Sequence, residues 1–147
     1  MANALYPAFK SRLISPGADL VAGLIGAGAG TEPTAAPLKA ALLAGYTYAA
    51  AHDFFNDISA SVVGDPVAVT GGAVAAGAFD ADDTVFSAVA EGSTIGAVAL
   101  YMDTGTPATS PLVALVDTGT GGALAIETSG GNITIKWDDG ASKIFTL

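Results

Sequence analysis

The 147-residue sequence contains no cysteine, and its five Lys and Arg residues are outnumbered by fourteen Asp and Glu residues. Without cysteine, a disulfide framework, a thiolate metal site and thiol catalysis are all excluded. The formal net charge is −9, and no cation lies between Lys39 and Lys136. Because binding to phosphates needs Lys or Arg to displace counterions, nucleic acid, nucleotides and anionic membranes are not expected as partners.

Long hydrophobic runs are missing as well. The most apolar stretch, residues 20–30, is too short and too rich in glycine to cross a bilayer, so no membrane span is expected. The N-terminal residues carry no basic region ahead of an apolar segment, and we therefore expect no signal peptide. These features predict a protein that is made and assembled in a cytoplasm.

Apolar residues are nevertheless abundant, at 51% of the chain with a mean hydropathy of +0.54. A chain of this length is expected to form one domain with a real core. Much of the apolar content is Ala and Gly, and few charges are left to cover the surface. We therefore expect apolar patches on the folded monomer, which a permanent oligomer or a lattice would hide.

In the first part of the chain, short regular elements are expected on either side of a Gly-, Ala- and Pro-rich segment. Residues 4–15 are expected to form a short helix with Pro7 in its first turn. Residues 16–37 are rich in Gly, Ala and Pro and are predicted to be a loop or an extended arm. A strand over residues 38–44, closed by a turn at Gly45, and a short helix over residues 48–58 are expected to follow.

The remainder reads as β-strands separated by turns. Two stretches, residues 95–102 and 112–116, are apolar on both faces and are predicted to be central strands. Ile133, Ile135 and Trp137 alternate with polar residues, as in a half-exposed strand. The other expected features are strands over 61–70 (an edge or bulge, because of Pro66), 73–79 and 85–89, and a hairpin turn at Asp138–Gly140 leading to a strand over 142–147.

This pattern predicts a mainly β fold, an antiparallel β-sandwich or barrel-like domain with one or two short helices. Residues 38–147 would form the β domain, and residues 1–37 an N-terminal arm.

The sharpest catalytic candidate is the string Asp-Thr-Gly, present at Asp103–Gly105 and again at Asp117–Gly119. In aspartic proteases two such aspartates share a proton and activate water. The same string is also ordinary turn chemistry, because Asp caps a turn and Gly adopts a left-handed conformation. The two strings flank one connection, so we expect them at opposite ends of paired strands or in adjacent loops, without a catalytic role.

Other chemically capable residues also have simple structural interpretations. The carboxylates of the acidic turns supply the oxygen ligands that Ca²⁺ prefers, but their spacing is not that of an EF-hand, and solvated turns are expected. His52, the only histidine, is expected to pack or cap rather than act as a base. Residues 26–30 lack the spacing of a dinucleotide-binding motif. The acidic turns are Asp80, Asp82, Asp83, Asp138 and Asp139; the aromatic residues expected in the core are Phe54, Phe55, Phe79, Phe86, Trp137 and Phe145.

Several segments, taken in order and spacing, resemble a known family. They are Met1–Pro7, Tyr46–Tyr48 with Ala51–Phe54, Phe79–Asp83 with Phe86, Ala99–Tyr101 with Asp103–Gly105, Ser110–Leu112, Asp117–Thr118 and Gly131–Leu147. Together they are similar to small virion structural proteins of tailed bacteriophages, over most of the chain except residues 16–37.

The resemblance implies a non-enzymatic particle component, with no catalytic, cofactor-binding or metal-binding residues and no cofactor. Within the virion, we expect a decoration or cement protein on the capsid exterior, forming a homotrimer and binding the major capsid protein, with residues 1–37 as its anchor. The alternative is a tail or head–tail connector component. A retropepsin-like aspartic protease is a third, weaker alternative.

Overall fold

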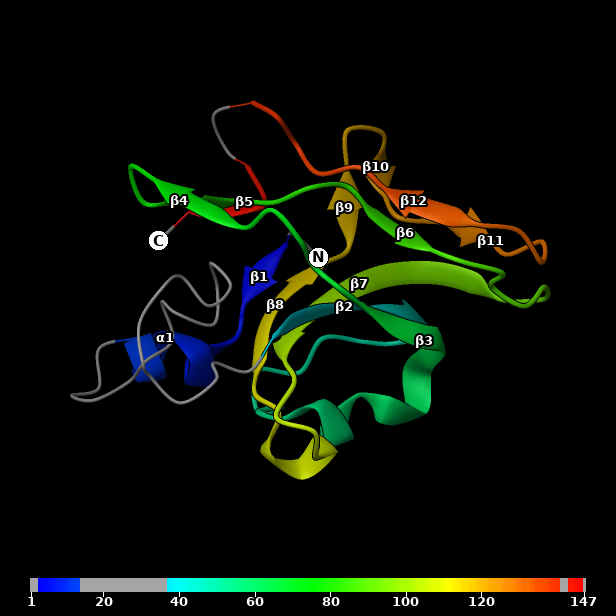
Figure 1. Ribbon diagram of the computed structural model, residues 1–147. Helices are drawn as coiled ribbons and strands as arrows, with labels where there is room; N and C mark the ends of the chain where they lie inside the picture. Colours follow the sequence, from blue (N-terminus) through cyan, green and yellow to red (C-terminus); the bar gives the residue numbers. More distant parts are fainter. Residues whose placement is uncertain (1–2, 14–36, 141–142, 147) are drawn as a thin grey trace.

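The computed structural model describes residues 3–13, 37–140 and 143–146. The fold is mainly β and its strand pairs are antiparallel, which confirms the predicted class (Figure 1). The helix α1 (Pro7–Leu13) follows the two-residue strand β1 (Ala4–Leu5), and the longer strands are β2 (Leu38–Ala44), β3 (Val62–Ala68), β7 (Thr94–Met102) and β8 (Leu112–Val116). The short strands are β4 (Ala73–Ala75), β5 (Ala78–Asp80), β6 (Thr84–Phe86), β9 (Thr118–Gly119), β10 (Gly122–Ala123), β11 (Ile126–Glu127), β12 (Ile133–Ile135) and β13 (Phe145–Thr146).

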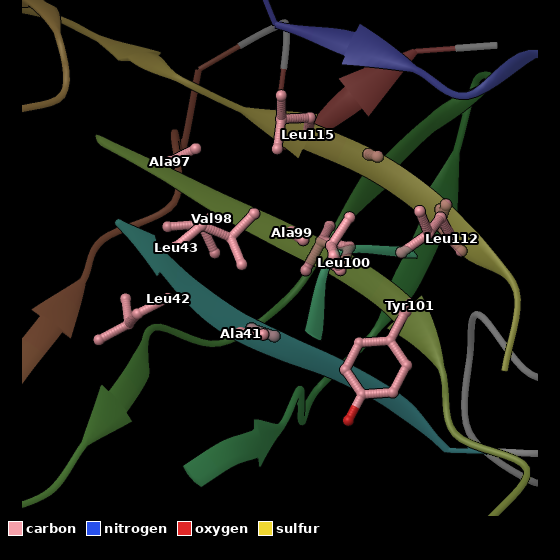
Figure 2. Close-up of a cluster of buried hydrophobic side chains, with 14 of the residues drawn as sticks. Ala41, Leu42, Leu43, Ala97, Val98, Ala99, Leu100, Tyr101, Leu112 and Leu115 are labelled. Atoms are coloured by element: carbon pink, nitrogen blue, oxygen red, sulfur yellow. The ribbon is translucent and has the colours of Figure 1, made fainter. Parts of the chain in front are cut away.

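The main sheet has the strand order β1-β8-β7-β2-β3, with β11 pairing beside the start of β7. As predicted, the two strands that are apolar on both faces are internal, and β7 and β8 are buried along most of their length. Figure 2 labels Leu42 on β2 and Val98 and Leu100 on β7, and all three side chains are fully buried. Burial on both faces explains why these strands carry no polar alternation.

β3 forms the far edge of this sheet, where the sequence predicted an edge strand or a bulge. Both features are present: the pairing with β2 shifts register between Ala40 and Leu42, opposite the stretch that contains Pro66. Proline cannot donate a hydrogen bond to a ladder, which is why it is tolerated here.

A second layer lies across one face of the main sheet (Figure 1). In it β6 pairs with β12, and β5 pairs with both β4 and β13. β3 of the main sheet packs beside β6, which joins the two layers along that side. The layers stand apart on the side of β1, β8 and β13, so among the described residues the sheet does not close into a barrel and the architecture is sandwich-like.

The helix expected over residues 48–58 is wrong. The chain instead forms an isolated bridge between Phe54 and Pro111, followed by single 3₁₀ turns at Phe55–Asp57 and Ser59–Ser61. The carboxylate of Asp57 accepts the backbone N–H groups of Asp53 and Phe54, at 2.9 and 3.0 Å. These side-chain bonds compete with helix formation by taking amides that a helix would use.

The hairpin expected at Asp138–Gly140 is also wrong, because β12 and β13 pair with β6 and β5 and not with each other. The Asp138 carboxylate accepts the Gly140 amide at 3.0 Å, but the turn does not reverse the chain onto β12. Trp137 helps to set the pairing: its backbone N–H donates to Asp83, and its indole N–H donates to Thr84 at 3.1 Å.

A tight hairpin occurs instead within the segment predicted as one strand over 73–79. Ala76 and Gly77 both have positive φ, 50° and 81°, and turn β4 back onto β5. Two successive left-handed residues match the twist of a two-residue hairpin, and only the second is the favoured glycine.

The N-terminal segment is divided between a strand and a helix. Ala4 and Leu5 pair with β8, and the helix begins at Pro7, where the missing N–H of proline costs nothing. Tyr6 and Phe9 are fully buried, so residues 3–13 pack as part of the β domain. Of the predicted loop or arm over 16–37, residues 16–36 lie outside the described residues.

The aromatic residues expected in the core divide into two groups. Phe79, Phe86 and Trp137 are buried, at 1%, 1% and 8% exposure. Phe54, Phe55 and Phe145 are half-buried, the last two packing against the core.

Candidate functional site

The first Asp-Thr-Gly string caps a turn at the end of β7. An Asp103 carboxylate oxygen accepts the Gly105 N–H at 2.9 Å, and Gly105 has a positive φ of 83°. The other oxygen pairs with the Lys39 ammonium at 2.6 Å. The hydrogen bond from Lys39, followed by that from Gly105, holds the pKa of Asp103 below its ordinary value. This arrangement is turn chemistry combined with an ion pair.

Replacing Asp103 by Asn should reduce stability in a pH-dependent way. Because the folded-state pKa of Asp103 is lowered, its stabilisation is present above the unfolded-state pKa and is lost as pH falls through the folded value. At pH 7 the variant should lose about 0.5–1 kcal/mol of unfolding free energy, a small amount because the pair is partly solvated. Chemical denaturation of both proteins at pH 7 and at low pH tests this: a difference that did not shrink in acid would contradict it.

The second string lies at the opposite end of the paired strands. Val116 pairs with Val98, so Asp117 and Asp103 are separated by roughly six residues, or roughly 20 Å, along the strands. A protease dyad requires two carboxylates that share a proton. The two strings therefore form no such dyad within one chain.

The acidic turns engage several protein donors. Asp80 pairs with Lys143 at 2.9 Å, Asp82 accepts the Thr70 hydroxyl at 3.2 Å, and Asp83 accepts the Trp137 amide. In residues 3–13, 37–140 and 143–146, no group of three His, Cys, Asp or Glu side chains is arranged to hold a metal ion. The glycine-rich residues 26–30 lie outside these ranges.

His52 belongs to a hydrogen-bonded chain of rings. Its Nδ1 lies 2.9 Å from the Tyr46 hydroxyl, which in turn lies 3.0 Å from the Tyr6 hydroxyl. Burial, followed by the hydrogen bond with Tyr46, raises the pKa of Tyr6 well above its usual range. The histidine thus packs against the loop after β2 and connects it to the entry of α1.

A cleft of about 930 Å³ lies where the two layers stand apart. One wall comes from the N-terminal segment and β8, including Asn3, Leu5 and Leu115. The facing wall comes from the chain around Trp137 and β13. Lys136 and Lys143 line the cleft together with Asp138 and Asp139, so cations and carboxylates are mixed there.

An apolar strand, β4, lies at the outer side of the second layer, and among the described residues one of its edges is left open. All three residues of β4 are exposed, and the strand pairs on one side with β5. Val74 lies opposite Phe79, whose ring is buried in the core, yet Val74 is 46% exposed. The apolar surface of this layer therefore extends from the buried core to the exposed strand β4. No charged residue occurs in residues 70–79, which contain this strand.

Comparison with models of known protein families and with curated proteins found no match to this chain. Within the described residues, no helix has both the length and the apolar character that crossing a membrane requires. Function is therefore inferred from the residues and their geometry.

Sequence reasoning missed the contacts between distant positions. Asn3 binds Thr118, Tyr6 binds Tyr46, and Lys39 binds Asp103, and no local pattern marks any of these pairs. The resemblance to phage proteins did include residues 1–7, 46–48 and 103–105, but without indicating which residues meet.

Proposed function

We propose that this chain is a non-enzymatic structural protein of a tailed-bacteriophage virion, a decoration or cement protein on the outside of the head. It would act as a homo-oligomer, a trimer by resemblance, that binds the major capsid protein and reinforces the lattice. Each contact can be modest, because repetition over the lattice makes the reinforcement cumulative.

The open edge at β4 is the observation that carries this proposal. Edge strands in monomeric proteins are commonly protected by Lys, Pro, bulges or inward-pointing charges. β4 carries an exposed valine and two exposed alanines, without charge or proline. A strand of this kind is suited to pairing with another protein chain, as a subunit of an assembly requires.

The described carboxylates give further support to a structural role. Asp57, Asp80 and Asp103 each bind backbone amides or a lysine, and the pKa of each is lowered. A general acid that works near neutral pH needs a raised pKa, and these shifts are in the opposite direction.

Purified virions provide the direct test. A decoration protein should occur at a copy number comparable to that of the major capsid protein, and particles that lack it should release their genome at a lower temperature. A much lower copy number would favour the tail or head–tail connector alternative. Unchanged thermal release would contradict the cement role.

Replacing Val74 by Lys should weaken binding to undecorated heads by roughly tenfold or more, because a buried, unpaired ammonium is costly at a contact. Co-sedimentation with heads measures this. Val85→Lys is the matched control: Val85 is 44% exposed, but its strand β6 pairs with β12 and has β3 packed beside it. Both variants should keep the wild-type melting temperature within a few degrees, and equal loss of binding by both would contradict a contact at β4.

A further inference from the structure

The N-terminal segment, residues 3–13, is held by parts of the chain that are distant in sequence. The Asn3 side chain contacts Thr118, the Tyr6 amide donates to the Val113 carbonyl at 3.1 Å, and the Tyr6 ring lies 5.3 Å from that of Tyr48. These contacts seat the segment on a surface that is built by residues far from it in the sequence.

The docking surface is specific at both ends of the segment. At one end the Asn3 amide oxygen accepts the backbone N–H groups of Asp117 and Thr118 and the Thr118 hydroxyl, at 2.9, 2.9 and 2.8 Å. The Asn3 amide nitrogen donates to the Thr118 carbonyl at 3.2 Å. At the other end Phe9 is fully buried and meets the Phe145 ring edge-on at 6.3 Å. The β8 edge and these pockets would accept the same segment from any copy of the chain.

The connection between this segment and the β domain is long. Residues 14–36 separate the end of α1 from Pro37, and Figure 1 shows α1 and the start of β2 on the same side of the molecule. Most connections in compact domains have about 4–6 residues, and ones above about 12–15 are uncommon. Any 23 residues, if fully extended, span at most roughly 75–80 Å. A domain of this size is only roughly 40 Å across, so the connection can reach a neighbouring copy.

We propose that residues 3–13 are exchanged between neighbouring copies, the segment of one copy docking on β8 of the next. Exchange retains every contact described for the docked segment, so its cost is that of bringing two copies together. Within an oligomer the copies are already together, and each copy is exposed to its neighbours' segments at a high effective concentration. The inference rests on the homo-oligomer of the proposed function, but it concerns contacts between copies alone.

The test uses the absence of cysteine in the natural chain. One full-length copy carries Asn3→Cys, a second, separately tagged copy carries Thr118→Cys, and the two are co-expressed, purified together and oxidised. Because each chain then has one thiol, a disulfide between the two tagged variants requires the segment of one copy to lie on β8 of the other. The expected product is a cross-linked pair of twice the monomer mass. Its yield should be roughly tenfold or more above that from a control mixture of Asn3→Cys with Ser87→Cys. Ser87 is exposed and lies just beyond β6.

A single chain carrying both Asn3→Cys and Thr118→Cys provides the opposing measurement. An intrachain disulfide in this variant, together with no enrichment of the cross-copy pair, would overturn exchange in favour of docking within each copy. Absence of both products would overturn it too, because the segment would then not occupy β8 at all. The cross-linking experiment contains no phage heads. A negative cross-linking result therefore does not contradict binding to heads, and a protein that fails to bind heads can still give the cross-linked pair.

Discussion

Phe9→Ala is expected to lower the free energy of unfolding by about 3–5 kcal/mol, as measured for buried phenylalanines in other proteins. Phe9 is fully buried and packs edge-on against Phe145, so truncation removes apolar contact from both the helix and the last strand. Domains of this size have only about 5–15 kcal/mol of stability. One residue near the N-terminus is therefore expected to account for a large part of it.

Urea denaturation followed by circular dichroism measures the effect. Lys10→Ala is the matched control, because Lys10 lies next to Phe9 on α1 but is exposed, and its replacement should change stability by less than about 0.5 kcal/mol. If both variants unfolded at the same denaturant concentration, the docking of residues 3–13 would be contradicted, and segment exchange with it.

Trp137→Ala is expected to cost a similar amount, about 3–5 kcal/mol. Trp137 is 8% exposed and lies where the pairing of the second layer passes from β12 toward β13. Its indole N–H is bonded to the hydroxyl of Thr84, itself 3% exposed. Truncation would widen the cleft that Trp137 lines and leave that buried hydroxyl without its donor.

Trp137→Phe separates the two contributions. It keeps much of the ring volume and loses the hydrogen bond, so we expect a cost of about 1–2 kcal/mol. Circular dichroism should again follow unfolding, because Trp137 is the only tryptophan and both variants lose its fluorescence. An alanine variant no less stable than the phenylalanine variant would show that the ring does not pack between the layers.

The packing of Tyr6 and Phe9 also changes the expectation for the N-terminus. From the sequence, residues 1–37 are expected to form an arm that anchors the protein to the shell. Since residues 3–13 contribute two fully buried aromatic side chains to the core, deleting residues 1–37 should destabilise the β domain as well as affect binding. A smaller deletion that spares residues 3–13 is therefore the cleaner probe of an anchor.

The sequence by itself determined the fold class and the central strands. Val98, Leu100 and Leu112 belong to short stretches without polar alternation, the pattern that a strand buried on both faces shows. It also determined the turn at Asp103–Gly105, because an Asp cap and a left-handed glycine act over two residues. Such features depend on neighbours in the chain and can be predicted locally.

Only the tertiary structure decided which strands pair, how residues 3–13 dock and which edge of the described strands is left open. β12 and β13 looked like a hairpin, yet they pair with β6 and β5, because Trp137 bonds Asp83 and Thr84 from across the second layer. Asn3 and Thr118 are 115 positions apart, and nothing near either residue specifies the other. These features depend on contacts that form only when distant segments pack together, so they cannot be predicted from local periodicity.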